Sequence, residues 1–326
     1  MRLHMTPLRI AGIAAALLAL SGWSALAPAQ TYPAKPVRVI IPWPSGGLTD
    51  VVGRIVFQRV SENVGQQFII DNRPGATGSI GADVVAKSPP DGYTLMVHSM
   101  AHLGNPYIYK KLPYDTLGDF AGIGTLVRQT GLLVVHPSLP VKNVKELIGL
   151  AKARPDQILY ASSGSGSFSH FAVVLLNSMT GTRMVHVPYK GGGPATTAMV
   201  SGETQVLVGS PAAVTTQLAS GRLRLLAVTS DTRLKAFPQA PTVAEAGVPG
   251  YEYTGWVGVF APAKVPAAVV ERMSAAIRKA IESPETAKRL EEFEPWTLTP
   301  PQMAARIRVD YEKFGRLVKL VGDKID

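Results

Sequence analysis

Short apolar runs alternate with amphipathic stretches along most of the chain, a rhythm typical of strands followed by helices. The first cycle is a strand at residues 37–41 and an amphipathic helix at 50–63. Strands at 68–71 and 93–97 follow, with a short helix at 80–86 between them. Strands that alternate with helices of this length predict βαβ units and a mainly parallel sheet.

The same rhythm returns in the middle of the chain and predicts a second α/β unit. A loop of Ser and Gly at residues 162–167 joins a strand to a helix there. The predicted elements are helices at 144–153 and 169–179, a helix opened by Gly191-Gly192-Gly193-Pro194, and strands at 158–161, 184–187, 206–208 and 223–228.

Two apolar runs lie between the two units, at 120–127 and 132–135, and the polar joint Arg128-Gln129-Thr130 separates them. A matching apolar run at 256–261 follows the second unit. We therefore expect the chain to cross between two lobes twice.

Two crossings make the first lobe discontinuous. We predict lobe 1 from residues 30–128 and 252–326, and lobe 2 from residues 129–251. The tail of lobe 1 is predicted to be helical at 266–282 and 300–321, with Pro near the start of each helix. The fold class is α/β, with a mainly parallel sheet flanked by helices in each lobe and a ligand cleft between the lobes.

The first 29 residues have the features of an export signal. Arg2 and Arg9 give a positive start, residues 10–20 are apolar, and Ala27-Pro28-Ala29 ends the stretch as an A-x-A site. We predict cleavage after Ala29 and a periplasmic location, whereas the alternative is a buried N-terminal helix. Charges, Pro or Gly interrupt every later apolar run, so no membrane span is predicted.

The composition excludes several classes of protein. There is no cysteine, and hence no disulfide, thiolate nucleophile or cysteine-rich metal site. Without Arg2 and Arg9, 31 basic residues face 23 acidic ones, and this net charge of +8 either favours anionic partners or serves solubility. Because Lys and Arg are scattered singly, no nucleic-acid partner is predicted.

The clearest chemical signal is the Pro/Gly loop, residues 42–50, with the sequence Pro-Trp-Pro-Ser-Gly-Gly-Leu-Thr-Asp. Its glycines let the backbone approach a ligand, and the free amides at the start of the next helix attract a carboxylate. Asp50 caps that helix in the favoured interpretation, with Thr49 as a competing cap. In the alternative, Asp50 binds an ammonium group of the ligand.

The Ser/Gly loop, residues 162–167, is the counterpart in the second unit. Its hydroxyls and amides suit a carboxylate held by hydrogen bonds, whereas the alternative is a plain flexible loop. Both loops follow the carboxyl end of a strand, so we expect them to face each other across a cleft that a dicarboxylate could bridge. Residues 191–194 give a third helix start or only a tight turn. His170 either reaches the ligand or only packs.

The motifs of common enzymes are absent, including G-x-S-x-G, G-x-x-x-x-G-K-[ST], a complete G-x-G-x-x-G and H-E-x-x-H. His98 and His102 stand four apart, but His98 ends a predicted strand and no carboxylate lies beside the pair, so no metal is predicted. We predict neither an enzyme nor a cofactor. An exported serine hydrolase is the alternative, because a Ser/His/Asp site can be assembled from distant residues.

In its ordered short motifs, the chain from about residue 32 to 321 resembles the tripartite tricarboxylate transporter substrate-binding proteins, also called the Bug family. The matching stretches are Tyr32-Pro33-Ala34-Lys35-Pro36, residues 42–50, Asn72-Arg73-Pro74-Gly75, Asp91-Gly92-Tyr93-Thr94-Leu95, Leu112-Pro113-Tyr114-Asp115, Tyr160-Ala161-Ser162-Ser163-Gly164, Val187-Pro188-Tyr189-Lys190-Gly191 and Pro241-Thr242-Val243-Ala244-Glu245.

This resemblance implies a two-lobed, type II-like periplasmic binding protein whose lobes close on a small organic acid, often through bridging waters. It also implies membrane transporter subunits as partners, and we expect a monomer. The implied ligand-binding residues are Trp43, Ser45, Gly46, Gly47 and Asp50, with Ser99 nearby, in lobe 1, and Ser163, Gly164, Ser167 and His170 in lobe 2.

Two positions depart from the family pattern. Gly209-Ser210 stands where many members have Asp-Asn, and Trp43 stands where Phe is common. A smaller polar wall opposite a larger aromatic one suits a flat acid. The predicted function is capture of a small mono- or dicarboxylate for uptake, and the alternative to transport is a ligand-sensing subunit of a membrane signalling protein.

Overall fold

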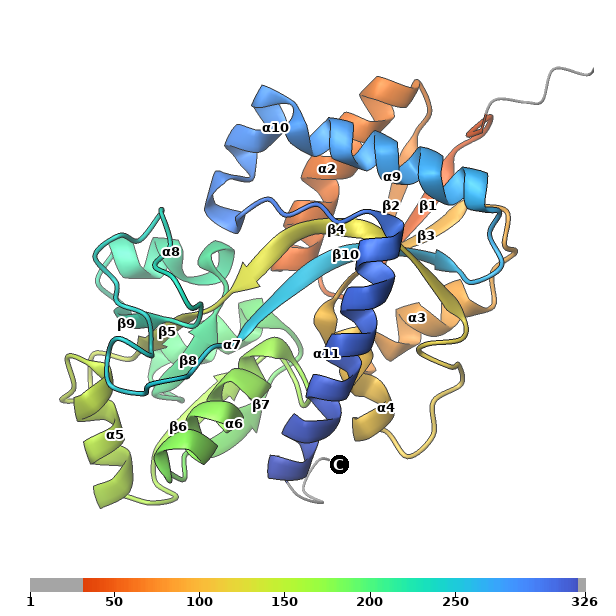
Figure 1. The fold of residues 1–326 in the computed structure, drawn as a ribbon. Coiled ribbons are helices and arrows are strands. Elements are labelled where there is room, and N and C mark those ends of the chain that lie inside the picture. The colour runs from red at the N-terminus through yellow and green to blue at the C-terminus, as the bar shows by residue number, and fades with distance from the viewer. Residues whose placement is uncertain (1–31, 322–326) are drawn as a thin grey trace, which may run out of the picture. The chain divides into compact units, whose positions relative to one another are not determined.

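Two five-stranded sheets organise the chain from Lys35 onward, which forms one compact unit (Figure 1). The computed structural model describes residues 32–321, and the predicted signal peptide lies outside them. Each sheet with the helices packed on it makes one lobe. The predicted two-lobed α/β architecture is confirmed, whereas the exact lobe boundaries stay a prediction.

The first sheet has the strand order β2-β1-β3-β10-β4. Strands β1 (Val37–Ile41), β2 (Phe68–Asn72) and β3 (Thr94–Ser99) are parallel. Strand β10 (Thr254–Pro262) runs antiparallel to both of its neighbours, β3 and β4 (Phe120–Thr130). The apolar, almost fully buried sequence of β1 fits a strand that is covered on both faces of the sheet.

The second sheet repeats this plan with the order β7-β6-β8-β5-β9. Strands β6 (Leu159–Ser162), β7 (Val185–Pro188) and β8 (Val206–Gly209) are parallel. Strand β5 (Leu132–Val135) runs antiparallel to β8 and β9 (Arg224–Val228). In each sheet one strand of five therefore runs against the others, so both sheets are mixed but mainly parallel.

Helices flank both sheets, and the predicted helices all occur. Three short ones were not predicted, α4, α8 and α10, because helices of four to nine residues are too short to display a clear period. The helices are α2 (Leu48–Val64), α3 (Ser79–Ala86), α4 (Asn105–Ile108), α5 (Val144–Ala153), α6 (Phe168–Thr180), α7 (Gly192–Ser201), α8 (Pro211–Ala219), α9 (Ala267–Glu282), α10 (Pro284–Arg289) and α11 (Pro300–Val321), with 3-10 turns η1 (Ala76–Gly78), η2 (Met100–Gly104) and η3 (Glu291–Phe293).

The polar joint at residues 128–130 was wrongly predicted to interrupt the strand. Strand β4 continues to Thr130 because β10 supplies a ladder partner for each of these residues, with Arg128 opposite Trp256 and Thr130 opposite Thr254. Backbone pairing thus outweighs the polar character of these side chains, of which Arg128 is exposed and Thr130 is buried with its hydroxyl donating to Glu294 Oε2.

The two segments that cross between the lobes are joined by hydrogen bonds. The Gly131 amide donates to Thr229 Oγ1 at 2.8 Å, and the Thr229 amide donates to the Gly131 carbonyl at 2.9 Å. The Tyr253 amide in turn donates to the Thr229 carbonyl at 2.8 Å. Both crossings therefore meet at one point, between β4 and β5 and just before β10.

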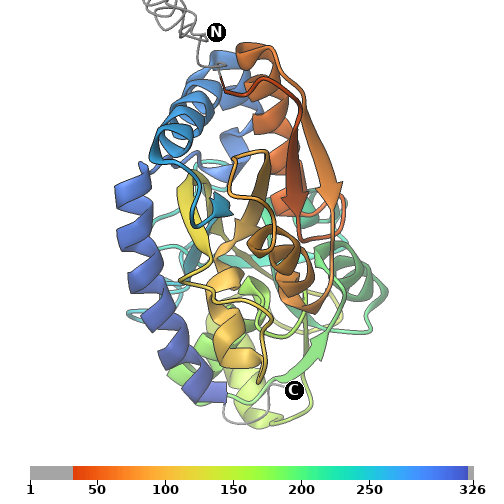
Figure 2. The same ribbon diagram turned by 90° about the vertical axis from the view of Figure 1, so that its right-hand side faces the viewer.

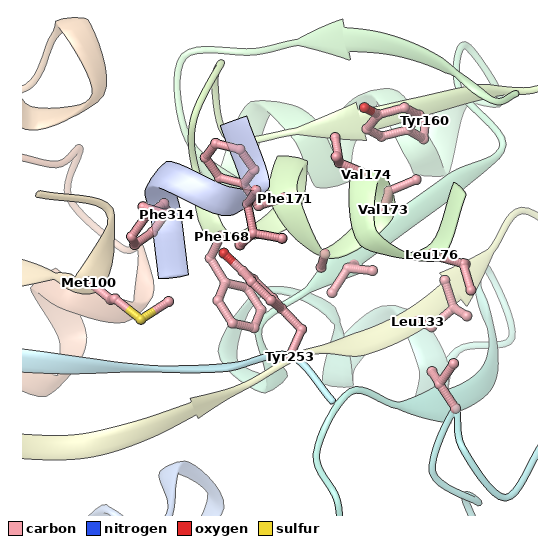
Figure 3. Packing of buried hydrophobic residues seen from close by; sticks show 14 of the residues in the cluster. Met100, Leu133, Tyr160, Phe168, Phe171, Val173, Val174, Leu176, Tyr253 and Phe314 are labelled. Atoms are coloured by element: carbon pink, nitrogen blue, oxygen red, sulfur yellow. The ribbon is translucent and has the colours of Figure 1, made fainter. Parts of the chain in front are cut away.

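Helix α11 packs against elements of both lobes, including β4 and α6 (Figures 1 and 2). Trp256 Nε1 in β10 donates to Asp310 Oδ2 in α11 at 2.7 Å. Phe314 of α11 packs edge-on against Phe171 of α6, with ring centroids 5.3 Å apart (Figure 3). The apolar core is therefore continuous from one lobe to the other on this side. Within residues 32–321, no helix combines the length and the apolarity that a bilayer crossing requires.

We predict that Gly131→Ala lowers the free energy of unfolding by about 1–3 kcal/mol, because the protein is closely packed around this crossing. An added Cβ would lie 2.3 Å from Val208 Cγ1 and 2.9 Å from Phe168 Cε1. The control is Gly149→Ala on the exposed face of α5, where no atom lies within 4 Å and a gain of about 0.5–1 kcal/mol is expected. Urea unfolding measures both variants, and equal midpoints would contradict the prediction.

Candidate functional site

In each sheet, one loop follows a central strand that lies between the next two parallel strands of the same sheet. Strand β1 lies between β2 and β3 and is followed by the Pro/Gly loop. Strand β6 lies between β7 and β8 and is followed by the Ser/Gly loop. At such switch points the connections leave toward opposite sides, and a crevice opens at the carboxyl ends of the strands.

A cavity of about 510 Å³ lies between these loops. Lobe 1 lines it with residues 43–49 and Ser99, and Gln129 near the end of β4 lines it as well. Lobe 2 lines it with Ser163 and with the first turns of α6, α7 and α8. Four helices, α2, α6, α7 and α8, thus begin at the wall of one cavity.

Helix α2 begins without a side-chain cap. Its N-cap residue is Gly47, so the prediction that Asp50 or Thr49 caps the helix was wrong. The first-turn amides of Leu48 and Thr49 have no acceptor within the helix, and both residues line the cavity. Because Gly47 has no side chain to accept from them, these amides are available to an anion.

Asp50 instead braces the Pro/Gly loop from behind. Its carboxylate accepts hydrogen bonds from the Gly46 amide, Arg54 Nε and Asn72 Nδ2, each at 2.9 Å. Burial by itself would raise the pKa of Asp50, but the hydrogen bonds from Arg54, Gly46 and Asn72 outweigh it and hold the pKa below its usual value. The carboxylate is therefore ionised and fully engaged, and the loop backbone is held in place.

Three hydroxyls gather in and just after the Ser/Gly loop. Ser167 is the N-cap of α6 and accepts from the His170 amide at 3.3 Å. Ser169 Oγ lies 3.1 Å from the hydroxyls of both Ser163 and Ser167, and all three serines line the cavity. These two contacts use two of three hydroxyl hydrogens, so one remains for a ligand.

Helices α7 and α8 add two further starts. Gly191 is the N-cap of α7 and offers no side chain, so residues 191–194 form the third helix start that was one of two predicted alternatives. Helix α8 begins after Ser210 with Pro211 at its first position. Ser followed by Pro is a known start signal, and it was overlooked because the following helix has only nine residues.

Trp43 is held at the cavity wall by a buried histidine. Trp43 Nε1 donates to His98 Nδ1 at 3.3 Å, and the two rings meet edge to face with centroids 5.8 Å apart. Ser99, the next residue after His98, also lines the cavity. The indole therefore has a fixed orientation on the lobe 1 side.

The structure brings together most of the predicted ligand-binding residues. Those that line the cavity are Trp43, Ser45, Gly46, Gly47, Ser99, Ser163 and Ser167.

Asp50, Gly164 and His170 lie outside the cavity lining. The Gly164 amide and carbonyl bond within the Ser/Gly loop, to Ser162 Oγ and the Ser167 amide. His170 is buried, and its Nδ1 accepts from the Gly166 amide at 3.0 Å. Like Asp50, these two residues hold a binding loop in shape.

The cavity-lining residues that sequence reasoning missed include Gln129, Gln217 and Arg222. Among the described residues, neither Gln129 Oε1 nor Gln217 Oε1 has a hydrogen-bond partner, although both atoms are buried. Single polar residues in a strand or a short helix carry no pattern, so only the tertiary structure reveals them.

The arrangement offers hydrogen-bond donors without an activated nucleophile. Ser162 Oγ lies 2.6 Å from His186 Nε2, but Ser162 is fully buried and does not line the cavity. Among residues 32–321, no serine hydroxyl that lines the cavity forms a hydrogen bond with a histidine ring. In the same part of the chain, no three His, Asp or Glu side chains lie close enough together to bind a metal ion. The free amides and hydroxyls at this cavity are suited to holding an anion.

Known proteins are similar to this chain in sequence. Residues 52–322 match the family described as the tripartite tricarboxylate transporter family receptor. Protein BugT of Bordetella pertussis is 32% identical over 325 residues, which are 98% of this chain and 100% of BugT.

Several solved structures are similar to this chain in fold and sequence. The R. palustris protein Rpa4515 with adipate is 35% identical, with a TM-score of 0.86 over 89% of this chain and 98% of that one. The periplasmic binding protein BugD is 28% identical, with a TM-score of 0.83 over 89% of this chain and 99% of that one. MatC from Rhodopseudomonas palustris with bound malate is 28% identical, with a TM-score of 0.81 over 88% and 100%.

We predict that acid destabilises the protein from about pH 6.5 downward, because buried histidines must take up protons on unfolding. Burial lowers the pKa of His102 to about 3 and that of His186 to about 4. Burial and a histidine neighbour lower the pKa of His170 to about 3 and that of His98 well below its usual value.

In the unfolded chain each of these histidines titrates near 6.5, so the unfolded state binds more protons between about pH 4 and 6.5. The free energy of unfolding should therefore fall with a slope that grows to at most about 1.4 kcal/mol per histidine and pH unit as the unfolded chain becomes fully protonated. Urea midpoints at pH 7, 6 and 5 measure it. A stability that is flat between pH 7 and 5 would show that these rings are not neutral and buried together.

Proposed function

The chain belongs to the tripartite tricarboxylate transporter family of receptors, and from this premise we propose that it captures a small organic carboxylate outside the cytoplasm for uptake by a membrane transporter. One observation carries the proposal: four helices begin at one cavity, and no acidic side chain lines it within the described chain. Helix starts carry partial positive charge and free amides, which favour a bound anion.

Hydrogen bonds, rather than an arginine clamp in either loop, are proposed to hold the carboxylate. The donors are the first-turn amides of α2 and α6 and the hydroxyls around Ser169. Such amides are fixed before the ligand arrives, so little reorganisation opposes binding. Two relatives of 28% and 35% identity are described with malate and adipate, which supports a carboxylate as the ligand class.

The seven predicted residues that line the cavity are proposed to contact the ligand, and Asp50, Gly164 and His170 are proposed to shape the loops. We further propose a periplasmic location, with the leader removed after Ala29, and a monomer that docks on transporter subunits. The lobe boundaries at 128/129 and 251/252 are part of the same proposal. Since the one serine of the Ser/Gly loop that lies beside a histidine ring in the described chain, Ser162, is buried outside the cavity lining, we propose reversible binding without catalysis.

Lobe closure is proposed to accompany binding. Thr77 Oγ1 of lobe 1 donates to the Ser165 carbonyl in the Ser/Gly loop at 2.7 Å. Thr77 and its neighbour Ala76 have positive φ angles, 50° and 46°, which are uncommon for residues with a Cβ. A strained turn that bonds across the cleft is consistent with a contact that exists only when the lobes are closed.

We predict that Gly47→Asp lowers the affinity for organic acids about a hundredfold or more, because the new carboxylate would repel the ligand's at the start of α2. Gly47 has φ −77°, and an added Cβ would meet only the Pro44 carbonyl, at 3.5 Å, so the backbone tolerates a side chain. Calorimetry with mono- and dicarboxylates measures the affinity.

Two controls isolate the charge. Gly47→Asn has nearly the same shape and accepts from the first-turn amides as Asp does, so it measures the loss due to capping alone and should keep more of the affinity than Gly47→Asp, whereas Gly149→Asp places the charge on exposed α5 and should change nothing. Unchanged binding by Gly47→Asp would refute the placement of the carboxylate. If the unaltered protein gave no heat with any acid of the panel, the proposed function itself would fail.

We predict that Thr77→Val weakens ligand binding about three- to tenfold, because the closed state loses one hydrogen bond between the lobes. Thr77→Ser keeps the hydroxyl and should bind as the unaltered protein does. Calorimetry with the tightest ligand of the panel measures both variants. A larger loss for Ser than for Val would contradict a role of this hydrogen bond in closure.

A further inference from the structure

The cavity extends past the two loops along helices α7 and α8. On α7 it is lined by Thr196, Thr197 and Val200, and on α8 by Ala213 and Gln217. Residues three and four apart lie on one face of a helix, so each helix turns a continuous face to the cavity. From Gly192 to Val200 the wall formed by α7 is about 12 Å long, at about 1.5 Å per residue.

A positive charge, that of the exposed Arg222 in the turn after α8, also lines the cavity. Among the described residues that line the cavity, Arg222 is the one charged side chain. Its amide donates to the Gln217 carbonyl at 2.9 Å, which fixes the turn after α8, and its Nε lies 3.4 Å from Ser220 Oγ. No ion pair with a carboxylate is recorded for Arg222 within residues 32–321.

Gln217 provides a second, independent sign of a binding site. Its Oε1 atom is buried and has no hydrogen-bond partner in the described chain, although it lines the cavity beside Arg222. A buried carboxamide without a partner costs free energy unless a ligand or water completes it. Turned about its last bond, the same group presents an N–H donor.

The wall between the helix starts and Arg222 is largely apolar. Val200, Leu207 and Ala213 line it, and the hydroxyls of Thr196 and Thr197 bond back to the Gly192 and Gly193 carbonyls. A volume of about 510 Å³ equals about seventeen waters at about 30 Å³ each, more than a four-carbon acid fills. The space therefore suits an aliphatic chain with polar ends.

We propose that this extension is a second anionic subsite, where Arg222 and Gln217 bind the distal carboxylate of an elongated aliphatic dicarboxylate. The inference rests on the proposed function, since the first carboxylate lies at the helix starts. Arg222 supplies two parallel N–H donors to a carboxylate, while Gln217 adds a neutral donor. The methylene chain between the two ends lies against Val200, Leu207 and Ala213.

Calorimetry with matched pairs of acids tests this subsite in the full-length mature protein. The series runs from succinate through adipate to suberate, and each diacid is compared with the monoacid of the same chain length, such as adipate with hexanoate. We expect affinity to rise from succinate toward the longer diacids. Arg222→Gln should weaken adipate or suberate binding about tenfold and leave hexanoate binding unchanged.

Matched variants separate the effect of this subsite on binding from the long-range electrostatic attraction of the whole protein. Arg183→Gln removes the same charge from an exposed arginine of lobe 2, which pairs with Asp156 outside the cavity, and should not affect either acid. Gln217→Leu should also weaken the diacid selectively.

Equal losses for mono- and diacids in Arg222→Gln would overturn the proposal, because Arg222 would then act only through long-range attraction. Unchanged diacid binding in Arg222→Gln would also overturn the proposal. If the helix-start substitution Gly47→Asp still abolished diacid binding, the proposed function itself would stay intact. Failure of every acid to bind the unaltered protein would instead remove the proposed function on which the subsite depends.

Discussion

The hydrogen bonds between Gly131, Thr229 and Tyr253 fix the two crossings of the chain against each other, and the binding site depends on this constraint. Because β4 runs through Gly131 into β5, and the segment before β10 bonds to the same point, both sheets are attached to one junction. The switch points at β1 and β6 then face one cavity. A Cβ at Gly131 would collide with Val208, so the junction has no space to spare.

In the proposed function, backbone dipoles at that cavity take the part that arginine has in many anion sites. Gly47 and Gly191 leave the first turns of α2 and α7 without side-chain caps, which costs helix stability but keeps amides available. The uncapped start of α2 is compensated nearby, since the ionised, buried Asp50 holds the loop through Gly46, Arg54 and Asn72. Helix stability is thus lower at the uncapped start of α2, and the hydrogen bonds of Asp50 stabilise the loop one turn away.

On both sides of the cavity, a buried histidine holds a neighbouring group in place. His98 orients Trp43, and His170 accepts from the Gly166 amide below the Ser/Gly loop. Both rings are neutral because burial opposes their protonation, so they act as hydrogen-bond acceptors without adding charge. Among the described residues that line the cavity, Arg222 is the exception to this charge-free lining, and it lies in the turn after α8.

The sequence by itself determined the strands, the long helices and the two loops, because apolar periodicity and Gly, Pro and Ser positions are local signals. Seven of ten predicted ligand-binding residues line the cavity for the same reason: they lie in those loops. Only the tertiary structure decided that β4 runs on to Thr130, since its partner β10 lies more than a hundred residues away. It also decided that Asp50 and His170 face the loops instead of the cavity, and that α8, Gln217 and Arg222 join the site. Side-chain direction and the meeting of distant elements depend on packing between lobes, which no local pattern contains.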